Sequence, residues 1–374
     1  MSTAMEGMTD TPRITENILD EWATSTHGPV ALHVKQQLLP VESEEGVVFP
    51  PTYANIGYNW DTLSDGTKMA MIDNVGSQAN RMEPIFMTGE LAALVPQIEI
   101  KINDSSRYSL LQLPHRSADA VVRSTPELLP EIEKAFKALR DGDAWPLCSI
   151  APTSLVFGVW DSRGTSVKRP RLVRAIIRAW DVELFHAAAQ FNSVWKALNE
   201  EQQDVLRAEA KGKNKFQLSD VGLADVPAVF RPDNSRVLGG VLAKGRIDRE
   251  VTVNLVALRG LVGRDEQQTE EIRKYLLGLS LLAATSDIDM FLREGCNLRY
   301  KGEDEWYSVP RRGEPQRVDL VSEEARGLIL QYATAAAESF KLNWPKSREF
   351  KFDVNEAKKL LAKKKSDENP AEGN

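Results

Sequence analysis

The stretch KMAMIDNVGSQANRMEP, residues 68–84, contains a change from strand to helix. Its first part, Lys68 to Asp73, is a short apolar run typical of a buried strand, and the next residues include the Asn and Gly of a turn. Residues 78–87 have helical spacing. The Ser77 hydroxyl is expected to cap this helix by accepting a bond from a free amide of the first turn. The stretch therefore predicts a strand, a tight turn and a helix N-terminus in succession.

Helices and strands are mixed irregularly in the rest of the chain. Residues up to 26 have weak helical character, and we expect them to form a loosely docked arm. The irregular order favours an α+β fold over a doubly wound α/β fold. The other expected elements are strands over 30–38, 95–103, 153–160, 237–242 and 247–256, helices over 128–140, 183–209, 266–284, 322–340 and 355–365, and a disordered tail over 366–374. The sequence SEEA at 322–325 resembles a capping box, so Ser322 is expected to cap the helix over 322–340.

The composition excludes several classes of protein. The 374 residues are 42% hydrophobic and 27% charged, which is typical of a folded chain of two domains, or of one domain with large insertions. A net charge of −7 excludes a generally basic protein that coats nucleic acid. Cys148 and Cys296 lie far apart, which excludes a disulfide scaffold and a cysteine zinc site. Because residues 1–13 and 275–284 lack the features of a signal peptide and a membrane span, we expect a cytoplasmic protein without a membrane partner.

Basic residues gather in stretches that contrast with the net acidity. Residues 163–178 contain six basic residues and no acidic one, and further clusters cover 236–264 and 341–365. We predict that these clusters bind a polyanion, and the alternative is a solvated charged edge. Phosphate binding would make the affinity fall with salt, with a log-log slope of about −0.7 per phosphate for single strands.

The segment LVRAIIRAWDV, residues 172–182, fits either a helix or a strand. Arg174 and Arg178 share a face in both cases, and as a strand the same face also carries Ile176 and Trp180. We favour the strand, whose other face is small and apolar and can pack on helices. Guanidinium groups beside an indole suit single-stranded nucleic acid, because Arg neutralises phosphate and flat side chains stack on bases.

Motifs of common enzymes do not occur in the sequence. It has no H-E-x-x-H, no G-x-S-x-G and no Walker A lysine, and the glycines at 240 and 245 lack the Lys-Ser/Thr pair of a P-loop. The four histidines have no ligand spacing. Asp73 and Asp161 each follow an expected strand, where turn chemistry explains them better than a metal does. We therefore predict no catalytic site, metal or cofactor.

Six short blocks of sequence, spread over roughly residues 30–355, resemble in content and order the blocks of a known family. They are IDNVGSQANRMEP (72–84), LVFGVWDSRG (155–164), PRLVR (170–174), GGVLA (239–243), VNLVALR (253–259) and SREFKF (347–352). In this order they resemble the CRISPR-associated RAMP superfamily protein that forms the repeated guide-RNA-binding backbone subunit of type I-G (formerly I-U) Cascade effector complexes. The resemblance implies an RRM-like (ferredoxin-like) palm with large inserted finger and thumb elements, over residues 1–365 as one domain. Residues 211–236 are the candidate thumb.

The resemblance also implies RNA-binding residues. It places the helix start beside a guide phosphate, which the free amides and the helix dipole favour. The alternative is a structural turn in which Arg81 pairs with Glu83 or Glu90. The expected RNA-binding residues are Ser77, Gln78, Asn80 and Arg81 at the helix start, Arg163, Lys168, Arg169, Arg171, Arg174 and Arg178 in the basic stretch, and Lys244, Arg246 and Arg249 on an expected hairpin.

The function implied by the resemblance is non-enzymatic. The chain would bind CRISPR guide RNA and present it for pairing with target DNA in antiviral defence, with recognition delegated to base pairing. Its implied partners are further copies in a helical filament, the large subunit, the guide-end-capping and processing subunit, and a recruited helicase-nuclease. One alternative is a metal-dependent ribonuclease that uses Asp220, Asp225 or Asp233. Another is a structural protein whose basic surfaces contact acidic partner subunits.

Overall fold

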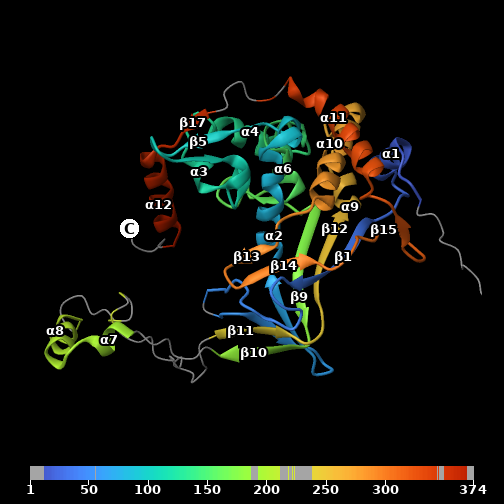
Figure 1. Cartoon of the computed structure of the whole chain (residues 1–374). Coiled ribbons are helices and arrows are strands. Elements are labelled where there is room, and N and C mark those ends of the chain that lie inside the picture. The colour runs from blue at the N-terminus through green and yellow to red at the C-terminus, as the bar shows by residue number, and fades with distance from the viewer. Residues whose placement is uncertain are drawn as a thin grey trace, which may run out of the picture.

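A curled antiparallel sheet forms the centre of the fold, with helices packed on one of its faces (Figure 1). The structure is a computed structural model that describes residues 12–54, 56–186, 193–210, 218, 221, 223, 238–342, 344 and 349–368. The fold contains an antiparallel central sheet together with helices, so the α+β prediction is confirmed. No described helix has both the length and the hydrophobicity that crossing a membrane requires.

The palm consists of four neighbouring strands with the order β14, β1, β12 and β9. Each strand is antiparallel to its neighbours. The long connection from β1 to β9 contains helices α2 to α6 as well as strands β2 to β8, and α10 lies in the connection from β12 to β14. With the strand order, this matches the connectivity of a ferredoxin-like fold with insertions. The predicted RRM-like palm is therefore present. Its elements are β1 (Ala31–Pro40), β9 (Val173–Trp180), β12 (Ile247–Asn254), α10 (Glu266–Thr285) and β14 (Cys296–Tyr300).

Further strands widen the palm and form small sheets beside it. On one side of the palm β4 pairs with β9, and on the other β13 pairs with β14 and β15 pairs with the first half of β1. The small sheets have the orders β10-β11-β2, β17-β5-β6 and β7-β8. The bounds are β2 (Val47–Val48), β3 (Asn59–Thr62), β4 (Lys68–Asp73), β5 (Glu99–Lys101), β6 (Arg107–Ser109), β7 (Val159–Trp160), β8 (Lys168–Arg169), β10 (Val182–His186), β11 (Leu238–Ala243), β13 (Phe291–Arg293), β15 (Trp306–Val309), β16 (Gln316–Val318) and β17 (Glu349–Lys351).

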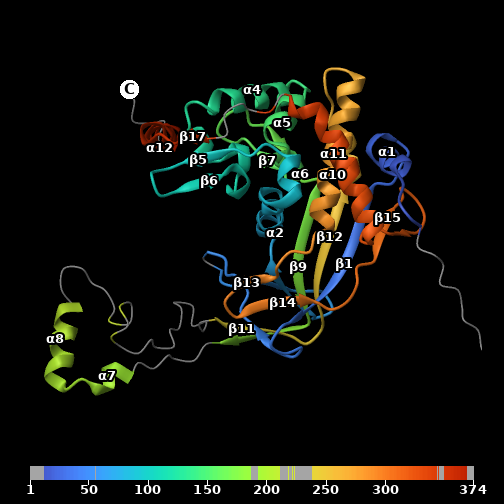
Figure 2. The ribbon, with the colours of Figure 1, turned by 45° about the horizontal axis from the view of Figure 1, so that its top comes forward.

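Helix α10 packs against β9 and β12 of the palm, and α11 packs on α10, as both ribbon views show (Figures 1 and 2). Gly278 of α10 lets α11 approach closely, because a Cβ there would lie 2.7 Å from the Ala333 Cβ. The predicted capping of α11 by Ser322 is confirmed, since its hydroxyl accepts a bond from the Ala325 amide at 3.2 Å. The other helices are α1 (Glu16–Thr24), α2 (Val75–Met82), α3 (Ala120–Arg123), α4 (Leu129–Arg140), α5 (Trp145–Ile150), α6 (Pro152–Val156), α7 (Ser193–Ala197), α8 (Glu200–Ala210), α9 (Leu255–Arg259), α11 (Glu323–Lys341) and α12 (Val354–Glu368).

Strand β9 confirms the strand interpretation of residues 172–182. Val173, Ala175 and Ile177 are buried against the helices, while Arg174 is exposed on the opposite face. We call this opposite side of β9, β12 and β1 the open face.

The small sheet β10-β11-β2 forms an arm beside the palm, and two chain connections join it to the palm strands. Strand β9 leads into β10 through Asp181, whose φ is +50°, and β11 leads into β12 through residues 244–246. The two connections are joined by hydrogen bonds, from the Lys244 amide to the Asp181 carbonyl and from the Trp180 amide to the Arg246 carbonyl, both 2.9 Å. The predicted hairpin at residues 243–246 is wrong, because β11 pairs with β10 and β2 whereas β12 pairs with β9 and β1.

Several other expected elements differ in the structure. The strand over 153–160 is a buried helix, α6, followed by the short strand β7, because Pro152 starts a helix well and a short apolar run has no diagnostic period. The long helix over 183–209 is wrong at its start, where β10 pairs with β11. The N-terminal arm is firmly docked, since Leu19 and Trp22 are buried. Helix α12 extends to residue 368, into the expected tail, and residues 369–374 lie outside the described residues, as does the candidate thumb 211–236 apart from 218, 221 and 223.

Candidate nucleic-acid interface

The first turn of α2 lies where strand β4 ends. Asn74 caps the helix, because its side-chain Oδ1 accepts a bond from the Ser77 amide at 2.9 Å. The expected cap was Ser77, so the helix begins earlier than predicted, at Val75. The α-helix ends at Met82, and a 3₁₀ helix over Glu83–Met87 continues it to the predicted end. The amides of this turn and the helix dipole favour an anion at this point.

Arg171 brings a guanidinium to this turn. Its Nη2 lies 4.0 Å from the position that a Cβ on Gly76 would occupy, so the guanidinium lies close to the first turn of α2. Burial lowers the pKa of Arg171, and the nearby positive charges of Arg116 and Arg174 lower it further. Like charges are therefore concentrated here, which a bound anion would relieve.

Arg116 supplies a further positive charge beneath the surface. It is buried, and its Nε lies 2.6 Å from the Oε2 of the buried Glu83. Its Nη2 also donates to the Oδ1 of the exposed Asn80 at 3.2 Å. Glu83 contacts Arg116 and neither Arg171 nor Arg174, and these two arginines have no ion-pair partner among the described residues.

The β7–β8 hairpin continues this surface toward solvent. Gly158 starts the hairpin with a φ of +80°, and a Cβ there would lie 2.8 Å from the Arg171 Cγ, so the two segments are in direct contact. Arg163 and Lys168 are exposed on the hairpin, whereas Arg169 points inward and its Nη2 donates to the Leu139 carbonyl at 3.2 Å. We use the name cationic lane for the surface formed by residues 75–77, Asn80, Arg163, Lys168, Arg171 and Arg174.

The open face of the palm adds polar groups that the sequence analysis missed. The register places Arg174, Thr252, His33 and Tyr307 in one row across four strands. The ring Nδ1 of His33 lies 3.0 Å from the Thr252 hydroxyl. The alternation of polar His33 and Lys35 with apolar residues in β1 is the signal that could have identified this face.

The other basic residues of the open face are paired with carboxylates. Arg178 pairs with Glu250 at 3.1 Å, and Lys35 with Asp248 at 3.1 Å. On the arm, Lys244 pairs with Glu183, and Arg246 lies 2.5 Å from Asp248 and over the ring of Trp180. These expected RNA-binding residues, Arg178, Lys244 and Arg246, therefore lie outside the cationic lane.

Two expected RNA-binding residues are buried in the palm, which corrects their assignment. Arg249 is fully buried, and its Nε donates to the Gln78 Oε1 at 2.9 Å while its Nη1 donates to the Gln36 Oε1 at 2.6 Å. Gln78 is also fully buried and donates to Asp73 at 2.7 Å. Because Arg249 shares a face with Ile247 and Val251, it points toward the helices and has a structural role.

Arg81 is also committed to contacts within the chain. Its Nε lies 3.1 Å from the Asp73 Oδ2, and its Nη2 donates to the Leu292 carbonyl at 2.9 Å. The structural alternative considered for Arg81 was a pair with Glu83 or Glu90, and the observed carboxylate is Asp73 instead. Arg81 thus holds β13 against α2.

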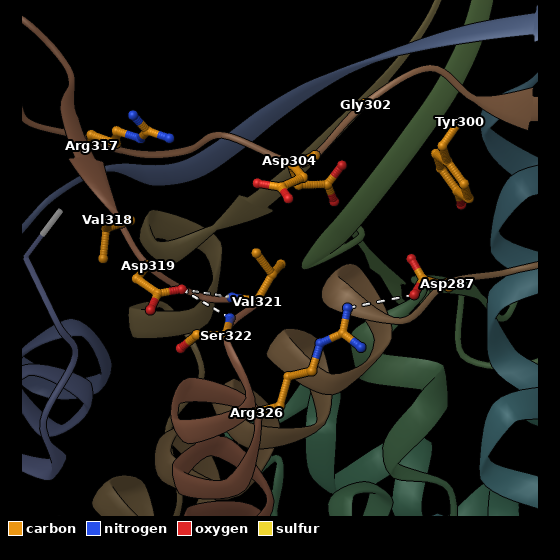
Figure 3. Close-up of a pocket in the computed structure, with 11 residues that line it drawn as sticks. Asp287, Tyr300, Gly302, Asp304, Arg317, Val318, Asp319, Val321, Ser322 and Arg326 are labelled. Atoms are coloured by element: carbon orange, nitrogen blue, oxygen red, sulfur yellow. Dashed lines mark hydrogen bonds and ion pairs between the residues drawn. The ribbon is translucent and has the colours of Figure 1, made fainter. Parts of the chain in front are cut away.

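A hollow of about 640 Å³ lies on the other side of the palm, beside the start of α11 (Figure 3). Arg326 reaches toward Asp287 at 3.5 Å, and the Asp319 carboxylate accepts bonds from the Val321 and Ser322 amides. Burial raises the pKa of Asp304, whose carboxylate accepts a bond from Gln36 at 2.6 Å. In the part of the chain that the structure describes, neither this hollow nor any other place gathers three or more His, Cys, Asp or Glu in a group suited to a metal ion. The candidate aspartates of the ribonuclease alternative, Asp220, Asp225 and Asp233, lie outside the described residues.

Comparison with known proteins gives one family match, which covers less than half of the chain. Residues 32–184 match the model of the family described as CRISPR-associated protein GSU0053 (Cas_GSU0053). The matched residues run from β1 to β10 and include the whole cationic lane. No curated protein matches the chain. The match indicates a CRISPR-associated protein with a role in CRISPR defence.

Proposed function

We propose that this chain binds CRISPR guide RNA as the repeated backbone subunit of a type I-G Cascade-like complex. The observation that supports the proposal is the cationic lane on an RRM-like palm. It contains four basic side chains that have no carboxylate partner among the described residues, within the segment that matches a CRISPR-associated family. A generic phosphate surface is what such a subunit needs, because base pairing between guide and target supplies the sequence recognition.

The lane suits the backbone of a single strand better than its bases. Arg171 and the α2 amides that precede the capped Ser77 amide offer donors to a phosphate, and Arg174 continues the charge onto the open face. Copies of the chain stacked along one RNA would join their lanes into a continuous track. In this proposal the cytoplasmic complex also contains the large, guide-end-capping and processing subunits, pairs the guide with target DNA, and recruits a helicase-nuclease, so that this chain itself needs no catalytic site.

Recovery of the assembled complex tests the proposal. The full chain is co-expressed with its complex partners and a CRISPR array, and the RNA that copurifies is sequenced. We expect protected guide RNA in the wild type and a strong loss in Arg171→Gln/Arg174→Gln. Arg299→Gln is the control, because Arg299 is an exposed arginine that already pairs with Glu44 at 3.4 Å. Absence of guide RNA from the wild-type complex refutes the proposal and favours a surface that contacts acidic partner subunits.

The same preparation distinguishes the ribonuclease alternative. The complex is incubated with Mg²⁺ and an RNA complementary to the guide, and intact RNA is expected. Cleavage that is lost in Asp220→Asn, Asp225→Asn or Asp233→Asn would replace the proposal of a non-enzymatic subunit.

A further inference from the structure

The β7–β8 hairpin presents an exposed tryptophan beside the cationic lane. Trp160 and Lys168 are cross-strand partners, and Trp160 is 60% exposed. The Lys168 Nζ lies 5.4 Å from the centroid of the indole ring. The indole is therefore open to solvent and has a positive charge beside its ring.

The loop that follows Trp160 is held in one shape by buried contacts. Asp161 is buried and forms an ion pair with the buried Arg123. The same carboxylate accepts bonds from the Thr165 amide at 2.7 Å and from the Thr165 hydroxyl at 2.8 Å. Gly164 is required here, because a Cβ would lie 2.5 Å from the Arg123 Nη2 and 2.6 Å from the Asp161 Oδ2. The indole is therefore attached to a rigid support, which lowers the entropy that binding would cost.

The charge around the indole favours a polyanion. Asp161 is the only acidic residue between Trp160 and Arg171, and it is buried and paired. Arg163 is exposed on the loop and has no ion-pair partner among the described residues. The hairpin also starts in contact with Arg171, so a strand that follows the cationic lane reaches the indole without leaving positive surface.

We infer that Trp160 is a stacking platform for an unpaired base of the bound RNA, with Lys168 and Arg163 on the adjacent phosphates. The inference rests on the proposed function, and it adds a base contact to a surface that otherwise binds only the backbone. A flat indole accepts any base, so the contact is independent of sequence.

Binding of single-stranded RNA to the full chain tests the inference. We expect Trp160→Ala to weaken the affinity for a uridine oligonucleotide by roughly 5- to 100-fold, the usual cost of losing one base–aromatic stack. The salt slope should stay unchanged, because no phosphate contact is removed. Trp160→Phe should retain most of the affinity, and an abasic oligonucleotide should bind wild type and Trp160→Ala equally.

Trp60 provides the matched control. It is 43% exposed on β3, and the Lys68 Nζ lies 5.8 Å from its ring centroid, but it is not on the cationic lane. Trp60→Ala should bind RNA like the wild type, and an equal loss in both variants refutes the inference. Wild-type affinity in Trp160→Ala also refutes it, while leaving the proposed function intact if the wild type binds RNA with a steep salt slope. If Trp160→Ala instead loses only self-association in sedimentation, the indole belongs to a protein interface.

Discussion

Removing the two unpaired arginines of the cationic lane should change the salt dependence of RNA binding by a predictable amount. Neither Arg171 nor Arg174 has a carboxylate partner among the described residues, and the proposal assigns one phosphate to each of them. Losing two phosphate contacts should lower the magnitude of the log-log salt slope by about 1.4, twice the value of about 0.7 per contact. Between 50 and 200 mM salt, the affinity advantage of the wild type over Arg171→Gln/Arg174→Gln should then shrink by about sevenfold.

The assay is fluorescence anisotropy of a labelled single-stranded RNA at several salt concentrations, with thermal unfolding to show that the variant is folded. Arg299→Gln/Arg326→Gln is the control, because these arginines are exposed and pair with Glu44 at 3.4 Å and with Asp287 at 3.5 Å. Their loss should leave the slope unchanged, since no phosphate contact is removed. Equal slopes for the wild type and Arg171→Gln/Arg174→Gln would show that RNA does not follow this surface.

Three further predictions concern the framework of the lane. Gly158→Ala should destabilise the fold by about 1–3 kcal/mol in urea unfolding and weaken RNA binding, because its φ is +80° and the new Cβ would lie 2.8 Å from the Arg171 Cγ; wild-type values for both would contradict this. Burial raises the pKa of Glu83 to about 7 from an ordinary 4.5, against the opposing charge of Arg116, so the folded protein keeps a proton that the unfolded chain releases. The contribution of Glu83 to the free energy of unfolding should be largest below pH 4.5 and fall by up to about 3 kcal/mol as the pH rises to about 7. Glu83→Gln should remove this pH dependence from the free energy of unfolding measured between those pH values. Arg249→Met should lower the free energy of unfolding by about 2–5 kcal/mol, since two buried amide oxygens lose their donors, and a loss of RNA binding without a loss of stability would speak against its structural role.

The elements that the sequence analysis located correctly are those with strong local signals. Strand β4 is found at the predicted residues, and α11 begins where its capping serine predicts. Strand β9 follows the period-two alternation, with Arg174 exposed and its neighbours buried. Such signals depend on neighbours a few residues away, so they survive without knowledge of the tertiary structure.

The predictions that were wrong concern segments whose secondary structure depends on contacts with residues far away in the sequence. The apolar run at 153–160 became a buried helix because it lies in the core, where a helix is apolar on all sides and shows no period. Residues 182–186 became a strand through pairing with β11, more than fifty residues later. Secondary-structure propensity is weak compared with such tertiary contacts.

The sequence alone determined where positive charge is concentrated and which residues of a strand share a face, because both follow from order along the chain. The sequence of β12 also predicts that Arg249 is buried, because residues 247, 249 and 251 share one face of the strand and Ile247 and Val251 are apolar. Only the tertiary structure decided which cations are available to a ligand. Arg178 is neutralised by Glu250 from another strand, whereas Arg171 is left unpaired beside the α2 turn. Ion pairing and burial are set by atoms within a few ångströms, and in a sheet those atoms come from strands far apart in the sequence.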